Sequence, residues 1–289
     1  MVLMQEHAQA IREWFVRRLA EADILDGSGC DALLSLPLQA RRIEARTDIV
    51  GGTDPRGAHL ILSGIAYRYE FLPDGVRRIV ALYFPGDLCF SRLPIPTASQ
   101  GTLEALCEVT VADLPNRTLR SLTEAHPATE RALWWHSSVE LEITRQWLVL
   151  AGRLADQRIA HLICEILARI GAVGTGRTDT LPNHFRQTVI ADITAISIVH
   201  VSRVLQALRA SGLIALKRGV VTVQDHAGLA ALADFDPGYL HLPGSKALPR
   251  SGRAARTDAA AVASLLRGGR SGSTRQPSAP EQPLPASAR

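Results

Sequence analysis

Residues 187–209 (QTVIADITAISIVHVSRVLQALR) carry side chains that can hydrogen-bond to the edges of bases and to phosphates. Apolar residues recur three and four positions apart along the second half of this stretch, at Val201, Val204, Leu205 and Leu208. This spacing predicts a helix with one buried stripe. The opposite face carries Val199, His200, Ser202, Arg203 and Gln206. We expect that face to fit the major groove of DNA.

A short helix and a turn are predicted just before this helix. Three apolar side chains give the first segment one buried face: Val189, Ile190 and Ile193. The turn consists of residues 194–196, with Ile196 pointing inward. Ser197 stands where a helix N-cap belongs, because its hydroxyl oxygen accepts a hydrogen bond from an unpaired backbone N–H. Taken alone, this pattern fits an ordinary αα-corner as well as a helix-turn-helix.

The residues that follow favour the helix-turn-helix. Residues 213–216 and 220–223 are apolar and predict two short strands, and Lys217, Arg218 and Gly219 form the turn between them. A helix-turn-helix followed at once by a small hairpin with a cationic tip is a winged helix. We expect Lys217 and Arg218 to contact the phosphate backbone.

The composition sets limits on the rest of the chain. Its 289 residues suffice for two domains. The formal net charge is only +4, so any surface that binds nucleic acid must be local. No apolar run is long enough to span a bilayer, and the first residues lack the core of a signal peptide. These features predict a cytoplasmic protein.

Catalytic and metal-binding patterns are not found in the sequence. Four cysteines are scattered, at Cys30, Cys89, Cys107 and Cys164, and no pair has metal-ligand spacing. We interpret them as buried thiols in a reducing compartment. No Ser/His/Asp set, carboxylate pair or P-loop stands out, which argues against an enzyme.

The first half of the chain predicts an antiparallel β-structure after short helices. Between residues 41 and 114 the apolar period is two, with residues 59–69 and 78–84 forming a hairpin about a turn at residues 73–75. Many short strands separated by Gly, Pro and Asp favour a small barrel or roll. Residues 89–102 are irregular, and either line a pocket or form a plain surface loop.

Residues 119–154 predict one long helix. Its main apolar stripe consists of Ala132, Trp135, Val139, Ile143, Trp147, Leu150 and Leu154, with Leu133, Leu141 and Leu148 adding apolar surface beyond it. A helix that is apolar on more than one side needs two partners. The roll covers one side, and a second copy of the helix in a coiled-coil-like contact covers the other. The alternative is a core helix buried within one subunit.

A second helix is predicted over residues 155–170, followed by a loop to residue 179 that leads into the winged helix. Beyond residue 242 the chain is rich in Ser, Pro, Gly, Ala and Arg. With few large apolar residues, this tail cannot bury enough surface to order itself.

The predicted order of roll, long helix and winged helix-turn-helix resembles the Crp/Fnr family of bacterial transcription regulators over residues 20–242. The matching motifs are Phe84-Pro-Gly-Asp87, Gly212-Leu213-Ile214, and the set Gln187, Ala191, Asp192, Ser197, Val201 and Arg203. Residues 199–203 (VHVSR) resemble the VHVNR variant of a proteobacterial branch, which shares ALWW at residues 132–135 and FDPGYLHL at residues 235–242.

This resemblance implies an α+β fold with four parts. An antiparallel, cyclic-nucleotide-binding-like β-roll with N-terminal helices spans residues 1–118, and a long dimerisation helix spans residues 119–154. A winged helix-turn-helix follows over residues 155–242, and a disordered tail over residues 243–289. The resemblance also implies a homodimer on a near-palindromic operator, with half-site centres roughly 34 Å apart, and RNA polymerase as a further partner.

The resemblance assigns a role to individual residues. Arg203 matches the family's recognition-helix arginine, which reaches O6 and N7 of a guanine as a fork. Val199, His200 and Ser202 occupy neighbouring readout positions, and Ser197, Gln206, Gln187, Lys217 and Arg218 complete the expected DNA-binding set. The cyclic-AMP receptor has Arg and Glu where Ile198 and Val199 stand here, so we expect a different consensus site.

The expected effector pocket departs from that of the cyclic-AMP receptor. There a Gly-Glu pair binds the ribose, whereas this chain has Gly86-Asp87, one methylene shorter. Thr97-Ala98 stands where an Arg-Ser pair binds the cyclic phosphate, and Arg92 is the only nearby cation. A buried phosphate without its arginine loses several kcal/mol. These departures count against cyclic AMP, and no other effector or cofactor is indicated.

Two other sensor chemistries of the family find little support. The N-terminal cysteine cluster of the iron–sulfur branch is missing, because only Cys30 lies in that region. His59 or Cys89 could be nominated as axial ligands of a haem, but a lone histidine near a strand is usually structural.

The sequence therefore predicts a dimeric DNA-binding regulator with a degenerate sensor. A change in the roll would shift the long helices and so set the spacing of the recognition helices, although a constitutively competent dimer fits equally well. A second hypothesis is a ligand-binding signalling module whose winged domain contacts protein. The cations Arg203, Arg209, Lys217 and Arg218 discriminate between the two, because a protein contact would not need them.

Overall fold

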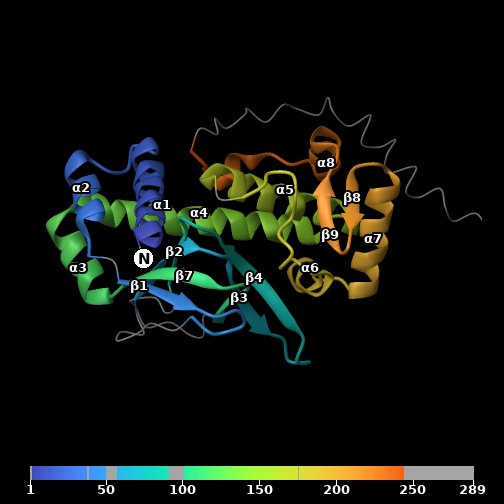
Figure 1. Cartoon of the computed structure of the whole chain (residues 1–289), viewed down its shortest axis with the longest axis horizontal. Coiled ribbons are helices and arrows are strands. Elements are labelled where there is room, and N and C mark those ends of the chain that lie inside the picture. The colour runs from blue at the N-terminus through green and yellow to red at the C-terminus, as the bar shows by residue number, and fades with distance from the viewer. Residues whose placement is uncertain (1, 38, 50–56, 91–100, 175, 244–289) are drawn as a thin grey trace, which may run out of the picture.

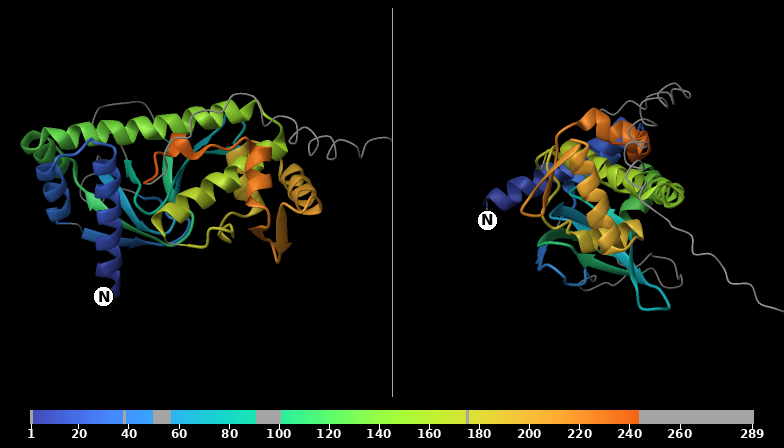
Figure 2. Two further views of the ribbon diagram at one scale, coloured as in Figure 1. Left: turned by 90° about the horizontal axis from the view of Figure 1, so that it is seen from above. Right: turned by 90° about the vertical axis from the view of Figure 1, so that its right-hand side faces the viewer.

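A computed structural model describes residues 2–37, 39–49, 57–90, 101–174 and 176–243 (Figure 1). Three residues of the expected effector pocket, Arg92, Thr97 and Ala98, lie outside the described residues, as does the tail from residue 244. Helix α4 runs along the molecule, with the β-roll beside it and the winged region at the end opposite α2 and α3 (Figures 1 and 2). This arrangement confirms the expected α+β fold.

The roll is built from two antiparallel sheets. One has the order β1-β7-β2-β5, from β1 (Gln39–Ile43), β7 (Val109–Leu114), β2 (Ala58–Ser63) and β5 (Leu88–Phe90). The other has the order β4-β3-β6, from β4 (Arg77–Tyr83), β3 (Ala66–Phe71) and β6 (Thr102–Ala105). Because side chains alternate along a strand, one face of each sheet fills the interior with residues such as Ile61, Val111 and Leu103.

One predicted strand is wrong: residues 59–69 form two strands, not one. The break falls at Gly64, whose φ of +79° places the backbone in the left-handed region. A Cβ there would lie 2.2 Å from the carbonyl oxygen of Glu108, so only glycine fits this close approach. After the break the chain enters the other sheet. The hairpin therefore consists of β3 and β4 alone, paired from Ala66–Tyr83 to Phe71–Arg77.

The single long helix predicted over residues 119–154 is also wrong. The chain forms α3 (Asn116–Ala125) and α4 (Pro127–Ala151), separated at His126. The cause is Pro127, which has no N–H to continue the preceding helix but suits the first turn of a new one. Leu154 lies beyond α4, at the N-cap of α5 (Ala155–Val173).

Two helices precede the roll, as the sequence predicts. Helix α1 (Val2–Glu21) packs its apolar stripe of Ile11, Trp14, Phe15 and Leu19 against the roll and α4 residues. Helix α2 (Gly27–Ser35) begins at Asp26, whose side chain accepts a hydrogen bond from the Gly29 N–H. This cap sets the N-terminus of α2.

The winged region follows α5. It comprises α6 (Gln187–Thr194), α7 (Ile198–Ala210), β8 (Ile214–Lys217), β9 (Val220–Val223), α8 (His226–Ala233) and a 3₁₀ turn, η1 (Pro237–Leu240). One apolar cluster joins this region to the roll, because Ile79, Leu82 and Phe84 belong to the same buried core as α5 and α7. The segment from residue 235 to 243 returns along α4 and α5 (Figure 2).

Among the described residues no single helix is long and apolar enough to cross a membrane. Helices α6 and α7 reach the required length and composition only when taken together, and they are bent by 105° at the turn between them.

Candidate DNA-binding surface

The turn between α6 and α7 sets the direction of the second helix. Ala195 has a φ of +55°, which ends α6 in the left-handed conformation. Ser197 then caps α7, because its Oγ accepts a hydrogen bond from the His200 N–H at 3.2 Å. The angle of 105° between the helices lies in the range of helix-turn-helix motifs. The predicted turn and cap are both present.

Helix α7 has a buried side and an exposed side, as its spacing predicts. Val201, Val204, Leu205 and Leu208 are buried in the core of the winged region. The exposed side carries Val199, which is 61% exposed, together with Ser197, His200, Arg203 and Gln206, while Ser202 is half-buried at its edge. The structure thus brings six of the nine predicted DNA-binding residues onto the front of one helix.

The hairpin of β8 and β9 presents the two predicted phosphate-binding cations. Arg218 and Gly219 have φ values of +51° and +81°, the left-handed pair that a two-residue hairpin turn requires. Lys217 ends β8, opposite Val220, instead of lying in the turn. The side chains of Lys217 and Arg218 are both exposed.

Gln187, the remaining predicted residue, is the first residue of α6 and is half-buried. The residue before it, Arg186, is exposed and makes no side-chain cap hydrogen bond to α6. Arg186 does not belong to the DNA-binding set predicted from the sequence. A cation beside a helix N-terminus is well placed for a phosphate, because the backbone N–H groups there attract anions as well.

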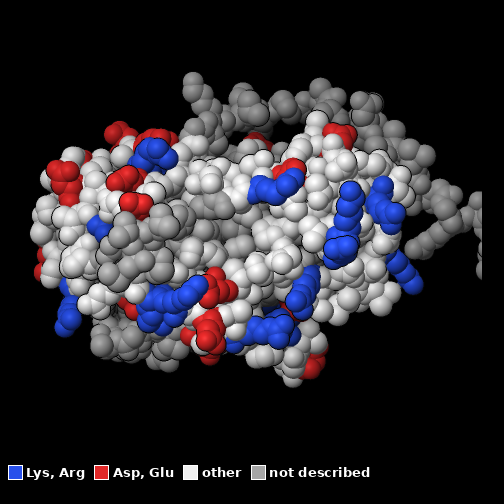
Figure 3. Space-filling view, viewed as in Figure 1, with Lys and Arg blue, Asp and Glu red and all other residues white. Residues whose placement is uncertain are grey.

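The electrostatics of this surface favour an anionic partner. Residues 198–223 contain no Asp or Glu, but do contain the cations Arg203, Arg209, Lys217 and Arg218. Figure 3 shows Lys and Arg side chains over the part of the molecule that holds α6, α7 and the wing, with few acidic side chains among them. This contrasts with the roll, where basic and acidic side chains lie side by side (Figure 3).

The expected effector residues Gly86 and Asp87 lie against helices, in a turn between β4 and β5. The Asp87 Oδ2 is 2.6 Å from Arg169 Nη2, and its Oδ1 is 3.3 Å from Arg18 Nη1. The Phe84 N–H donates to Oδ2 at 2.8 Å. Burial alone would raise the pKa of Asp87, but Arg169 and Arg18 outweigh burial and lower this pKa below its usual value. Asp87 is therefore an ionised, fully partnered carboxylate.

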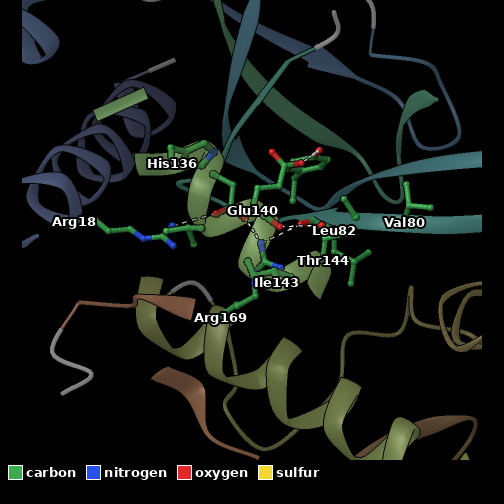
Figure 4. A pocket seen from close by; sticks show the side chains of 12 residues that line it. Arg18, Val80, Leu82, His136, Glu140, Ile143, Thr144 and Arg169 are labelled. Carbon is green, nitrogen blue, oxygen red and sulfur yellow. Dashed lines mark hydrogen bonds and ion pairs between the residues drawn. The ribbon is translucent and has the colours of Figure 1, made fainter. Parts of the chain in front are cut away.

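A small recess lies beside this turn, between β4, α4, α1 and α5 (Figure 4). Arg18, His136, Glu140 and Arg169 supply its polar lining, and Leu82 and Ile143 part of its apolar lining. The His136 Nε2 lies 2.6 Å from the Leu88 carbonyl oxygen, and burial lowers the pKa of His136. Basic and acidic side chains both line this recess.

The two residues nominated as haem ligands are held within the roll. His59 is 1% exposed, and its Nδ1 lies 2.7 Å from Asp113 Oδ1. The Cys89 thiol is fully buried, which raises its pKa far above the usual range, and its Sγ donates to the His59 carbonyl oxygen. Among the described residues no cluster of His, Cys, Asp or Glu could hold a metal ion. These contacts fit a structural role for both residues.

Comparisons with known proteins agree with this surface. Residues 157–232 match the Crp-like helix-turn-helix domain. The chain is 31% identical over 174 residues to the nitrogen fixation regulation protein FixK of Bradyrhizobium diazoefficiens, covering 60% of this chain and 72% of FixK. It is 27% identical over 237 residues to the transcriptional activator protein FnrA of Stutzerimonas stutzeri, covering 75% of this chain and 95% of FnrA.

Solved structures show the same fold. FixK2 from Bradyrhizobium japonicum superposes with a TM-score of 0.60 at 22% identity, over 67% of this chain and 96% of FixK2. A CRP-family transcriptional regulator from Thermus thermophilus superposes with a TM-score of 0.53 at 23% identity, over 68% of this chain and 97% of its own.

Proposed function

The chain belongs to the Crp/Fnr family of transcription regulators, and we propose that it binds a near-palindromic operator as a homodimer without cyclic AMP. DNA-binding transcription regulation is the function shared with its relatives. The main support for the proposed operator binding comes from helix α7. One side of this helix is buried, the other side is exposed with Arg203 at its centre, and the helix contains no acidic residue.

Sequence-specific contacts are assigned to the front of α7. Arg203 is exposed at the middle of the helix, where its guanidinium can reach O6 and N7 of one guanine. Val199, His200, Ser202 and Gln206 surround it and read adjacent base edges. Ser197, Gln187, Lys217 and Arg218 lie at the margins, where they contact phosphates and fix the register of the protein on the duplex.

Dimerisation is assigned to the exposed apolar face of α4. Trp134, Leu141 and Leu148 lie seven residues apart, and Trp134 and Leu148 are 70% and 71% exposed. This seven-residue spacing, found in coiled coils, keeps the three side chains on one side of a helix. The described residues of the same chain leave this face open, so a core helix buried within one subunit does not account for it. A second copy of α4 covers it in the proposed dimer.

The contacts of Asp87 argue against cyclic AMP as an effector. Both Asp87 carboxylate oxygens are engaged by arginines of the same chain, which leaves them unsuited to bind the hydroxyls of a ribose. We also propose RNA polymerase as a further partner, on the basis of the resemblance to the family. The competing proposal, a winged domain that contacts protein, leaves the four cations of residues 198–223 without an anionic partner in that segment.

Selection of the purified full-length protein on random duplex DNA, with and without cyclic AMP, tests this function. We expect a palindromic motif to be enriched equally in both conditions. Enrichment only with cyclic AMP would refute the inference that the ion-paired Asp87 cannot bind the ribose of this nucleotide. A motif without two-fold symmetry would refute the dimer, and no enrichment in either condition would favour the protein-contact alternative.

A further inference from the structure

We propose that Asp87, Arg18 and Arg169 form a latch that fixes the winged domain on the roll in the orientation that binds DNA, an inference that rests on the DNA-binding function proposed above. The three residues come from three parts of the chain. Asp87 belongs to the turn after β4, Arg18 to the N-terminal helix α1, and Arg169 to α5.

Arg169 connects the roll to α5. Besides its contact with Asp87, its Nη2 donates to the Leu82 carbonyl oxygen at 3.0 Å, and its Nη1 lies 3.4 Å from Glu165 Oε1. Its guanidinium stacks over the ring of Phe84 at 4.5 Å from the ring centre. All of these partners except Glu165 belong to the end of β4 and the turn that follows it. Arg169 thus attaches one face of α5 to the roll.

Arg18 connects the same carboxylate to the far end of the winged region. Its Nη2 donates to the Leu240 carbonyl oxygen at 2.8 Å, and its Nε donates to the His241 carbonyl oxygen at 3.1 Å. The guanidinium also lies over the indole rings of Trp14 and Trp135, 5.5 and 5.6 Å from their centres. One side chain of α1 therefore holds the roll turn, α4 and the segment after η1 together.

Gly86 and Trp14 add a second contact beside the ion pairs. Trp14 packs against Gly86 so closely that a Cβ there would lie 2.3 Å from a ring carbon, and the φ of Gly86 is +88°. The Trp14 Nε1 donates to the Ala172 carbonyl oxygen near the end of α5 at 2.9 Å. Trp14 and Arg18, four residues apart on one face of α1, therefore each contact the roll turn and the DNA-binding part of the chain.

The burial of these charges explains why they act as a unit. The side chains of Arg18, Arg169 and Asp87 are 5%, 7% and 11% exposed, so solvent cannot replace a lost partner. Two arginines face Asp87 and Glu165, and the four charges balance. Buried ion sets of this kind contribute little net stability, but removing one member leaves an uncompensated charge. They can instead select one arrangement of the parts they join.

Fixing α5 also fixes the recognition helix. Helix α5 packs directly on α6, α7 and α8, and its buried residues share one core with Val201, Leu205 and Leu208 of α7. In the latched arrangement Val199, Arg203 and Gln206 are exposed, so no described part of the roll covers them. The orientation is thus compatible with DNA. Holding it in advance lowers the ordering cost when two recognition helices bind one operator.

Replacing Asp87 by Asn tests the latch. The full-length D87N protein should bind the selected operator about tenfold more weakly, a change of roughly 1.4 kcal/mol, with the same preferred sequence. Amide hydrogen exchange should rise in α5 and in residues 238–241, because Arg169 and Arg18 attach these two segments to the turn that holds Asp87. The matched control is D113N. Asp113 also has two side-chain partners, Arg41 and His59, but they lie within the roll, so this variant should bind the operator like the wild type.

A second variant keeps the test decisive if D87N does not fold. Arg18→Gln removes the connection to residues 240 and 241 but leaves the Arg169–Asp87 pair, and it should weaken operator binding in the same direction. Folded variants with unchanged affinity and unchanged exchange would overturn the latch. Tighter binding would also overturn it, because the latched orientation would then be the one that excludes DNA. Failure of the wild-type protein to select any motif would instead refute the proposed function.

Discussion

Arg203 and Arg218 in the winged region differ from Arg18 and Arg169 beside the roll in their access to solvent and to acidic side chains. The first pair is exposed, in a segment without any Asp or Glu. The second pair is buried, and each arginine contacts Asp87. Exposed cations without partners attract an external anion, whereas buried ones with partners hold parts of one molecule together. The same residue type thus fits the proposed recognition of DNA at one end of the molecule and the proposed positioning of its parts in the middle.

The largest expected effect follows from breaking the buried set. Arg169→Met removes the arginine that contacts both the Asp87 and the Glu165 carboxylates. Among the described residues, Asp87 then keeps Arg18 as its one cationic partner. We expect the free energy of unfolding to fall by about 3–5 kcal/mol, measured by urea denaturation. Arg177→Met is the control, because Arg177 pairs with Asp179 at the surface and its loss should leave stability unchanged. Equal effects of the two variants would show that burial does not distinguish these arginines.

A second large effect concerns α4. Leu148→Glu places a carboxylate on the exposed apolar face, where it would lie in the proposed dimer interface. We expect a monomer in sedimentation experiments at micromolar concentration, and loss of tight operator binding. Phe71→Glu, a change at an equally exposed apolar residue on the β3–β4 hairpin, should leave the dimer intact. A dimeric L148E protein would place the interface elsewhere.

A moderate effect is expected from the centre of α7. Arg203→Ala should cost roughly 1–3 kcal/mol on the preferred operator and abolish discrimination at one base pair in each half-site. Anisotropy titrations with operators substituted one base pair at a time measure both quantities. Arg209→Ala, six residues further along the same helix, should keep that discrimination. If R203A still rejects the substituted operators as strongly as the wild type, Arg203 does not read a base.

The smallest effect is expected at the wing. Lys217→Ala should weaken binding to all sequences alike and lower the slope of log affinity against log salt by about one, because one phosphate contact is lost. Arg42→Ala on the roll, where Arg42 pairs with Glu108, should leave the slope unchanged. An unchanged slope for K217A would mean that the wing does not touch the phosphates.

The parts of the fold that depend on neighbouring residues could be predicted from the sequence. The period of α7 and the cap at Ser197 predicted its buried and exposed sides correctly. The apolar period of two predicted the β-structure of the roll, although it joined β2 and β3 into one strand. Pro127 carries a local signal for a helix start, and this signal predicts the break that the apolar stripe conceals. Arg186 could have been found in the same way, as a cation beside the start of α6.

The parts that depend on distant residues could not be predicted. Gly64 breaks a strand because of the Glu108 carbonyl oxygen, which lies forty-four positions away in the sequence. The partners of Asp87 lie 69 and 82 positions away, on helices whose orientation is set by packing. No spacing in the sequence connects Arg18 with residues 240 and 241. The exposed placement of the proposed DNA-binding residues was therefore predictable, and the contacts of the proposed latch were not.

The most direct test of the difference between the two regions is one selection on random duplex DNA, carried out in parallel with wild-type, R203A and D87N proteins. We expect the wild-type protein to enrich a palindromic motif. R203A should lose the preference at one position of each half-site, and D87N should enrich the unchanged motif more weakly. A D87N motif that differs in sequence, or an R203A motif identical to that of the wild type, would contradict the roles assigned to the exposed and buried arginines.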